Sequence, residues 1–184
     1  MVDAEPSLVD KIQAVHESFA VARIGHAFGG ALALAYYTLE PRATADIDVN
    51  VTLDASRARD TLSVLPTGVR WTEADVRRAT DDEQIRLWWG RTPLDLFFRA
   101  STFHDGVADR AQAMPFAGND LPFLSANDLA VFKALFDRPK DWLDISSMLE
   151  AGSLDLAWVG RTLTELLGAD SRVERILALG ARGV

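Results

Sequence analysis

The spacing of apolar residues predicts a helix near the start of the chain, followed by strands. Between positions 8 and 19, apolar residues recur three or four positions apart, which is typical of the buried face of an amphipathic helix. Residues 21–24 form a short apolar run that predicts a first strand. Helix-favouring residues fill positions 31–39, and polar and apolar residues then alternate over 45–53, the pattern of a half-buried strand.

The middle of the chain alternates between short helical patterns and strand patterns. The strand patterns over 84–89 and 92–98 are separated only by Gly90 and Arg91, so they predict an antiparallel pair joined by a tight turn. The other elements expected here are a helix over 55–65, a short strand over 69–71, a helix that starts at Thr72, a helix over 101–113 and a hairpin within 115–124.

The last third of the sequence has a helical pattern. Ser125 is a favourable N-cap residue, and a second helix is expected to start near Pro139. Two more helices are expected over 153–167 and 171–179. The sequence therefore predicts an α/β (α+β) fold with a short mixed sheet in residues 1–124, and a C-terminal helical subdomain, residues 125–184, packed on that core.

The composition agrees with an ordinary globular protein. The 184 residues are 48% hydrophobic and 25% charged, which suits one compact domain or a core with a small helical annex. There is no cysteine, no secretory signal pattern and no apolar run of the roughly 20 residues that a membrane span needs, so a cytoplasmic protein is the simplest expectation. The net charge of -8 argues against broad nucleic-acid binding, although it leaves room for a local basic patch.

Two aspartates and two glycines suggest nucleotide chemistry. Asp46 and Asp48 are two positions apart on an expected strand, so they share a face and repel each other unless a cation lies between them. Oxygen ligands of this kind favour Mg²⁺, which usually completes its coordination with water and substrate phosphates. Gly29 and Gly30 precede an expected helix and allow backbone N–H groups to approach a phosphate. A tight turn at the glycines and a solvated acidic strand are the alternatives.

The order of these features resembles the nucleotidyltransferase superfamily that includes DNA polymerase beta. Gly29-Gly30 followed by Arg42-x-Thr44-x-Asp46-x-Asp48 is most similar to the AbiEii/AbiGii-type toxin nucleotidyltransferases. The resemblance implies a minimal nucleotidyltransferase core, with Asp46 and Asp48 as catalytic metal ligands. It also implies nucleotide binding by Gly29, Gly30, Arg42 and Thr44.

Asp95 is a single charge within an apolar strand pattern. Because an unpaired buried carboxylate is costly, Asp95 is expected either to face solvent from an edge strand or to be held by a cation or another partner. The resemblance supports the second alternative, since enzymes of this family carry a third metal carboxylate on a later strand. Asp95 would then be a metal ligand and the base that accepts a proton from the attacking hydroxyl.

The helical part contains a further candidate group around Lys133. Lys133 can lay its stem on apolar surface or pair with a nearby acid, and Asp141 and Asp144 lie near the start of the next expected helix, where the helix dipole favours acids. The resemblance implies that Lys133 and one of these two aspartates contribute to activity, and it leaves open which one. His26, beside the glycines, is either a loop residue or a substrate contact.

The resemblance implies a complete reaction with substrates and partners. A nucleoside monophosphate would move from an NTP to an acceptor with one or two Mg²⁺ ions held by Asp46, Asp48 and Asp95, while Arg42 or Lys133 offsets the triphosphate charge. The physiological role would be the toxin of a bacterial toxin–antitoxin pair, with tRNA as acceptor and a cognate antitoxin as partner. The alternatives are an aminoglycoside- or lincosamide-type antibiotic nucleotidyltransferase, and a non-catalytic nucleotide- or partner-binding module of the same fold.

Overall fold

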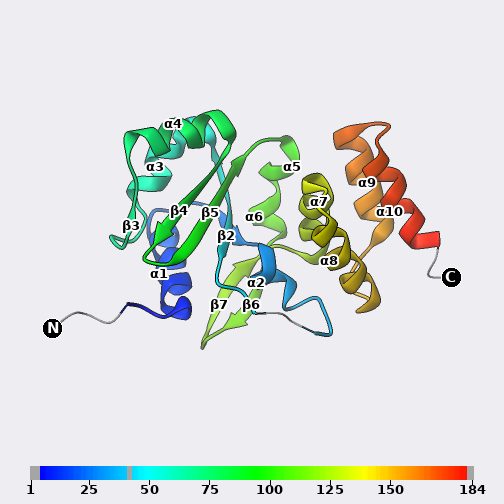
Figure 1. Cartoon of the computed structure of the whole chain (residues 1–184), viewed down its shortest axis with the longest axis horizontal. Helices are drawn as coiled ribbons and strands as arrows, with labels where there is room; N and C mark the ends of the chain where they lie inside the picture. The colour runs from blue at the N-terminus through cyan, green and yellow to red at the C-terminus, as the bar shows by residue number, and fades with distance from the viewer. Residues whose placement is uncertain (1–4, 41–42, 182–184) are drawn as a thin grey trace. The chain divides into compact units, whose positions relative to one another are not determined.

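The computed structural model describes residues 5–40 and 43–181. Within these residues, seven strands form one mixed sheet in the order β3-β4-β5-β2-β1-β7-β6. Figure 1 shows β4, β5 and β2 side by side in this sheet. The strands are β1 (His26–Phe28), β2 (Ile47–Asp54), β3 (Val69–Arg70), β4 (Gln84–Trp89), β5 (Thr92–Arg99), β6 (Gln112–Phe116) and β7 (Asn119–Phe123). The helices are α1 (Leu8–Val21), α2 (Gly30–Leu34), the 3-10 turn η1 (Ala55–Arg57), α3 (Ala58–Ser63), α4 (Glu73–Asp82), α5 (Thr102–Asp105), α6 (Val107–Arg110), α7 (Ala126–Phe136), α8 (Pro139–Glu150), α9 (Leu156–Leu167) and α10 (Ser171–Ala181). The expected α/β fold with a mixed sheet and C-terminal helices is confirmed.

The described residues divide into two compact units. The sheet unit holds residues 5–32 and 43–123, and the helical unit holds residues 33–40 and 124–181. Residues 33–40 join the C-terminal helices through Tyr37, whose hydroxyl donates to the Leu124 carbonyl at 2.9 Å and whose carbonyl accepts from the Ser153 hydroxyl at 3.0 Å. Burial, with a smaller effect from Asp128, raises the pKa of Tyr37 to about 12, so its hydroxyl stays a donor.

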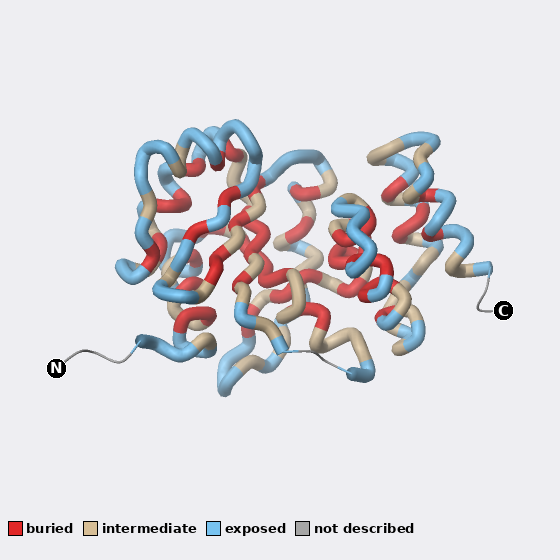
Figure 2. The backbone as a smooth tube through the Cα atoms, viewed as in Figure 1, coloured by how far each residue is buried: buried red, intermediate tan, exposed pale blue. Residues whose placement is uncertain are grey.

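The sheet unit is built around the central strand β2. It pairs parallel with β5 and antiparallel with β1, and Ile47, Val49 and Val51 on one of its faces are fully buried. Helix α1 contributes to the same core with Ile12, Val15 and Phe19, and the Phe19 ring contacts the His26 ring of β1. Figure 2 shows the central strands among the buried parts of the backbone. The alternating pattern therefore commits one face of β2 to packing and leaves the other for polar side chains.

The expected antiparallel pair is confirmed as β4 and β5. Trp89 pairs with Thr92 across the two-residue turn, where Gly90 has a φ of +61° that favours glycine. A buried lysine fixes this hairpin. Lys11 of α1 is 2% exposed, and its Nζ donates to the Trp89 carbonyl and the Thr92 hydroxyl, both at 3.0 Å, and to Glu5 at 2.6 Å.

Three expected elements differ from the structure. The strand expected over 21–24 is wrong, because α1 continues through Val21 and the first strand is His26–Phe28. The helix expected over 31–39 is limited to α2, five residues long. The helix expected over 101–113 is instead two four-residue helices separated by Gly106, because glycine has a poor helix propensity. Residues 112 and 113 belong to strand β6.

In the helical unit, α7 packs against both α8 and α9, and α9 packs against α10. Its buried side chains include Leu129, Ile145, Val159 and Ile176, one from each of α7 to α10. No helix in the described part of the chain is both long enough and apolar enough to span a bilayer.

Candidate functional site

The pairing of β2 with β5 brings the predicted carboxylates together. Asp48 is the register partner of Asp95 on the neighbouring parallel strand, and Asp46 precedes Asp48 by two positions. Directly paired residues point to the same side of a sheet, as do residues two apart on a strand. All three carboxylates therefore lie on one face, which we call the carboxylate face. Strand β5 lies between β4 and β2, so Asp95 is not on an edge strand.

Gly30 lies directly against the carboxylate of Asp48. A Cβ atom at Gly30 would lie 1.8 Å from Asp48 Oδ2, and its φ of +54° also favours glycine. The preceding amide, that of Gly29, donates to the Asp48 carbonyl at 2.8 Å. The two glycines thus bring the chain close to Asp48, and the Gly29 N–H is used inside the protein.

Thr44 orders the approach to Asp46. Its hydroxyl oxygen accepts from the Asp46 amide at 3.2 Å, a short-range contact typical of threonine before a strand. The Asp46 side chain is 45% exposed, whereas that of Asp95 is only 13% exposed. Arg42, predicted to bind nucleotide, lies outside the described residues.

Arg86 of β4 is a member of this cluster that was not among the residues predicted from the sequence. Its Nε and Nη2 donate to the two oxygens of Asp95 at 2.7 and 2.6 Å, and Nη2 lies 3.9 Å from Asp46 Oδ2. The hydrogen bonds that Arg86 donates to Asp95, followed by the negative charges of Asp95, Asp46 and Asp48, raise the pKa of Arg86 above its usual range. Arg86 therefore supplies a permanent positive charge beside three carboxylates, and it is the partner that Asp95 was expected to need.

The carboxylates suit a hard cation by their chemistry. Asp46, Asp48 and Asp95 offer only oxygen donors from one face of adjacent strands, the ligand type that Mg²⁺ prefers. In residues 5–40 and 43–181, no three acidic or histidine side chains are already grouped as a metal site, and both oxygens of Asp95 accept from Arg86. The three carboxylates fit Mg²⁺ if Asp95 exchanges the Arg86 guanidinium for the metal ion.

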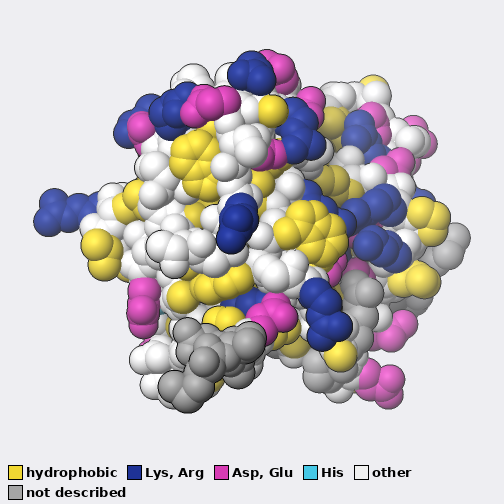
Figure 3. Space-filling model, turned by 60° about the vertical axis from the view of Figure 1, so that its left-hand side comes forward, with side chains coloured by type: hydrophobic (Ala, Val, Ile, Leu, Met, Phe, Trp, Pro, Cys, Tyr) yellow, Lys and Arg dark blue, Asp and Glu magenta, His cyan; other side chains and the backbone are white. Residues whose placement is uncertain are grey.

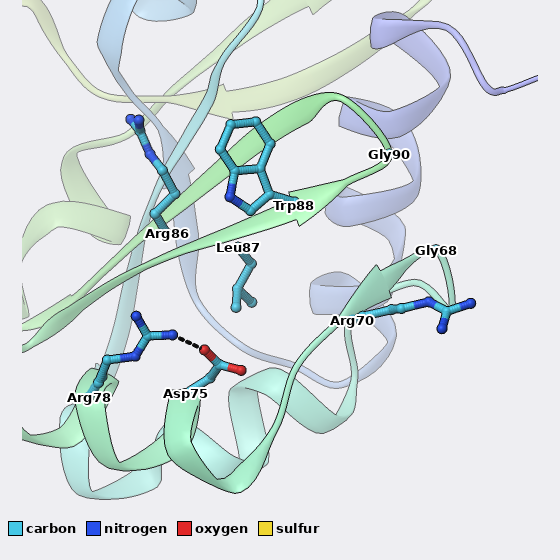
Figure 4. A pocket seen from close by; sticks show the side chains of 8 residues that line it. All are labelled: Gly68, Arg70, Asp75, Arg78, Arg86, Leu87, Trp88 and Gly90. Atoms are coloured by element: carbon cyan, nitrogen blue, oxygen red, sulfur yellow. Dashed lines mark hydrogen bonds and ion pairs between the residues drawn. The ribbon is translucent and has the colours of Figure 1, made fainter.

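A cavity of about 520 Å³ lies next to this cluster in the sheet unit. In Figure 4, Arg86 and Trp88 project from one side of β4 and Leu87 from the other, above the ion pair of Asp75 with Arg78 on α4. The remaining residues of the lining are Gly68, Arg70 and Gly90. The Trp88 side chain is 53% exposed. Its register partner is Arg70. The lining has three guanidinium groups and one carboxylate, and Figure 3 shows Lys and Arg side chains beside hydrophobic ones on the face that it brings forward.

Lys133, Asp141 and Asp144 form a buried ion-pair network within the helical unit. The Lys133 Nζ lies 2.6 Å from Asp144 and 3.6 Å from Asp141, and Asp141 also accepts from Arg138 Nε at 2.6 Å. Burial raises the pKa of Asp141, but the hydrogen bond from Arg138 and the charges of Lys133 and Arg138 outweigh it, so the pKa is below its ordinary value. The structure thus brings together all three residues of this predicted group.

His26 lies among core residues of the sheet unit. It lies on β1, is 7% exposed, and its Nδ1 is 2.9 Å from the Ile24 carbonyl. Its Nε2 lies 3.0 Å from His16 Nδ1. Burial lowers the pKa of His26, so the ring stays neutral near pH 7. Packed against Phe19 and Phe28, His26 belongs to the core of the sheet unit.

Solved structures with a similar fold are nucleotidyltransferases or proteins like them. The antibiotic-resistance factor ANT(2'')-Ia is 18% identical with a TM-score of 0.53, and the match covers 95% of this chain and 91% of that chain. An antigenic nucleotidyltransferase-like protein from Paracoccidioides brasiliensis is 16% identical with a TM-score of 0.55, covering 91% and 92%. The lincosamide antibiotic adenylyltransferase LnuA, solved with lincomycin bound, is 13% identical with a TM-score of 0.52, covering 77% and 96%.

Sequence comparison adds no family to this likeness of fold. No protein-family model matches the chain, and no curated protein matches its sequence. At these identities the structural likeness shows the fold, which is that of a nucleotidyltransferase.

Proposed function

We propose that this chain is a metal-dependent nucleotidyltransferase that moves a nucleoside monophosphate from an NTP to an acceptor and releases pyrophosphate. The main support is the register of Asp48 with Asp95, with Asp46 on the same face and Gly30 against Asp48, in a chain with a nucleotidyltransferase fold. Such a face supplies several anionic oxygens beside a backbone segment without a side chain. Those are the two features that a Mg²⁺–triphosphate complex needs.

The residues of the carboxylate face have separate roles in this proposal. Asp46, Asp48 and Asp95 would hold Mg²⁺, which when bound neutralises charge on the phosphates. Gly30 lets the backbone lie directly against the Asp48 carboxylate, while Gly29 keeps its amide for the Asp48 carbonyl. Asp95 would also accept the proton of the acceptor hydroxyl.

The remaining predicted residues stay within the proposal. Arg42 would offset triphosphate charge and Thr44 would hold the segment that leads to Asp46. Lys133, with Asp141 and Asp144, is proposed to contribute to activity as well as to the stability of the helical unit.

The acceptor we favour is tRNA, with a toxin role and a cognate antitoxin as partner. The motif Arg42-x-Thr44-x-Asp46-x-Asp48 supports this choice by its resemblance to AbiEii-type enzymes. The surface at Arg86 and Trp88 supports it independently, because a guanidinium beside an exposed tryptophan on one side of β4 suits a phosphate and a planar base. The positive charge of Arg86 disfavours an aminoglycoside, which carries several ammonium groups.

An antibiotic acceptor is the second candidate. ANT(2'')-Ia has been solved with adenylyl-2''-tobramycin and LnuA with lincomycin, and both have folds similar to this chain. The repulsion between guanidinium and ammonium groups that disfavours an aminoglycoside is weaker for a lincosamide, which lacks the several ammonium groups. A non-catalytic nucleotide- or partner-binding module is the third, and the complete set of three aspartates argues against it.

One transfer assay tests the proposal. The protein is incubated with each labelled NTP and Mg²⁺, alone and with total tRNA, an aminoglycoside or a lincosamide, and label transfer and pyrophosphate are measured. We expect transfer to tRNA, and its loss in Asp48→Ala, which removes a metal ligand. Asp120→Ala, which removes an exposed aspartate from β7 of the same sheet, should retain full transfer. Absence of transfer and of pyrophosphate with every acceptor would refute the proposal, and transfer to a drug alone would replace the acceptor.

A further inference from the structure

The contact between Arg86 and Asp95 has a direct consequence for metal binding. Both oxygens of Asp95 accept from one guanidinium, at 2.7 and 2.6 Å, in the two-pronged geometry that makes arginine–carboxylate pairs strong. Arg86 is also the direct cross-strand partner of Asp95 in the β4–β5 ladder, so the backbone holds the two side chains opposite each other.

The two partners differ in their freedom to move. The Asp95 side chain is 13% exposed and lies between strands β4 and β2, whereas the Arg86 side chain is 53% exposed and borders the cavity of about 520 Å³. Arg86 has space to leave the pair while Asp95 stays in place. Trp88, two positions further along β4 on the same side, offers an aromatic surface along which a guanidinium can lie.

We propose that Arg86 is a positioning residue that holds Asp95 in the metal-free site and competes with the divalent cation for its carboxylate. This inference rests on the proposed function, because it takes Asp46, Asp48 and Asp95 as the ligands of the cation. Without metal, the positive charge of Arg86 reduces the repulsion among the three negatively charged aspartates. When the cation binds, it takes over this role and Arg86 releases Asp95. A loaded site therefore has the guanidinium displaced from Asp95 toward solvent, to which the Arg86 side chain is already 53% exposed.

Two variants separate the charge of Arg86 from its geometry. Arg86→Gln removes the positive charge, which repels a cation at the carboxylates, so it should bind Mn²⁺ about tenfold more tightly than the unmodified protein after allowance for solvent screening. Arg86→Lys keeps the charge and loses the two-pronged contact. It should bind Mn²⁺ within about twofold of the unmodified protein, because the positive charge beside the carboxylates remains.

The matched control is Arg78→Gln, which removes another guanidinium of the same cavity. Arg78 pairs with Asp75 on α4, and its loss should leave Mn²⁺ binding unchanged. Free Mn²⁺ is measured by electron paramagnetic resonance during titration, a measurement that requires no turnover. Thermal melting without metal provides a second readout, since Arg86→Gln should melt lower than the unmodified protein and regain the loss when Mn²⁺ is added.

The outcomes distinguish this inference from the proposed function. Tighter Mn²⁺ binding by Arg86→Gln, lost again when Asp48→Ala is added, supports both. Equal or weaker binding by Arg86→Gln, with Asp48→Ala still abolishing binding, overturns the competition and leaves the proposed function standing. Absence of Mn²⁺ binding in every variant overturns both.

Discussion

The contact between Gly30 and Asp48 gives the most direct test of how the site is built. In Gly30→Ala, the new Cβ would overlap Asp48 Oδ2 at 1.8 Å, and the residue would keep a φ of +54°. The left-handed backbone costs about 1–2 kcal/mol for a residue with a Cβ, and forcing a side chain out of a packed site costs about 1–3 kcal/mol. We therefore expect Gly30→Ala to lower the free energy of unfolding by about 2–5 kcal/mol.

A matched glycine separates these two contributions. Gly118, in the turn between β6 and β7, has a φ of +88°, and a Cβ there would have no atom within 4 Å. Gly118→Ala should therefore lose only the backbone contribution of about 1–2 kcal/mol. The overlap also predicts a coupling with Asp48, because shortening that side chain to alanine removes the atom that the new methyl group meets.

Urea unfolding followed by circular dichroism measures these differences, in Gly30→Ala, Gly118→Ala, Asp48→Ala and the double variant Gly30→Ala/Asp48→Ala. The double variant should be more stable than the sum of the single losses predicts, by about 1–3 kcal/mol. Nucleotidyl transfer should fall in Gly30→Ala, where Asp48 is displaced, and be retained in Gly118→Ala. Equal losses of stability at the two glycines, or additive effects of Gly30→Ala and Asp48→Ala, would show that the contact with Asp48 is not what requires glycine.

Two further predictions concern buried titratable side chains. Burial lowers the pKa of His104 to about 4, so between pH 6.5 and 4 the unfolded chain binds more protons than the folded one, and the stability present above pH 6.5 falls by about 3 kcal/mol as the solution is acidified. His104→Gln should flatten the plot of unfolding free energy against pH in that interval, and an unchanged slope would contradict this. Lys133→Ala leaves Asp141 and Asp144 without their shared partner and should cost about 3–5 kcal/mol in the same urea assay. The exposed Lys140→Ala should cost almost nothing, and equal effects at the two lysines would exclude a structural role for the network.

The position of Arg86 illustrates what the sequence contained but did not make evident. In a hairpin with a two-residue turn, residues at equal distances before and after the turn pair across the two strands. With the turn at Gly90-Arg91, this rule pairs Arg86 with Asp95. The alternation in β4 likewise places Arg86 and Trp88 on one side. Turn and register together therefore identify Arg86 as the partner of Asp95, although a pattern of metal-binding acids gives no indication of it. The pairing of Asp48 with Asp95 had no such local signal, because parallel neighbours are joined by a long connection.

The sequence by itself determined the local features of this protein. It indicated the alternation of β2, the β4–β5 hairpin, the C-terminal helices and the acid pair Asp46 and Asp48, because periodicity and turn chemistry act over a few residues. The tertiary structure decided where the first strand begins and how short α2 is. It also decided that Asp95 lies beside Asp48 and that Gly30 lies against Asp48. Those contacts depend on strand order and register, which are set by packing between segments far apart in the chain.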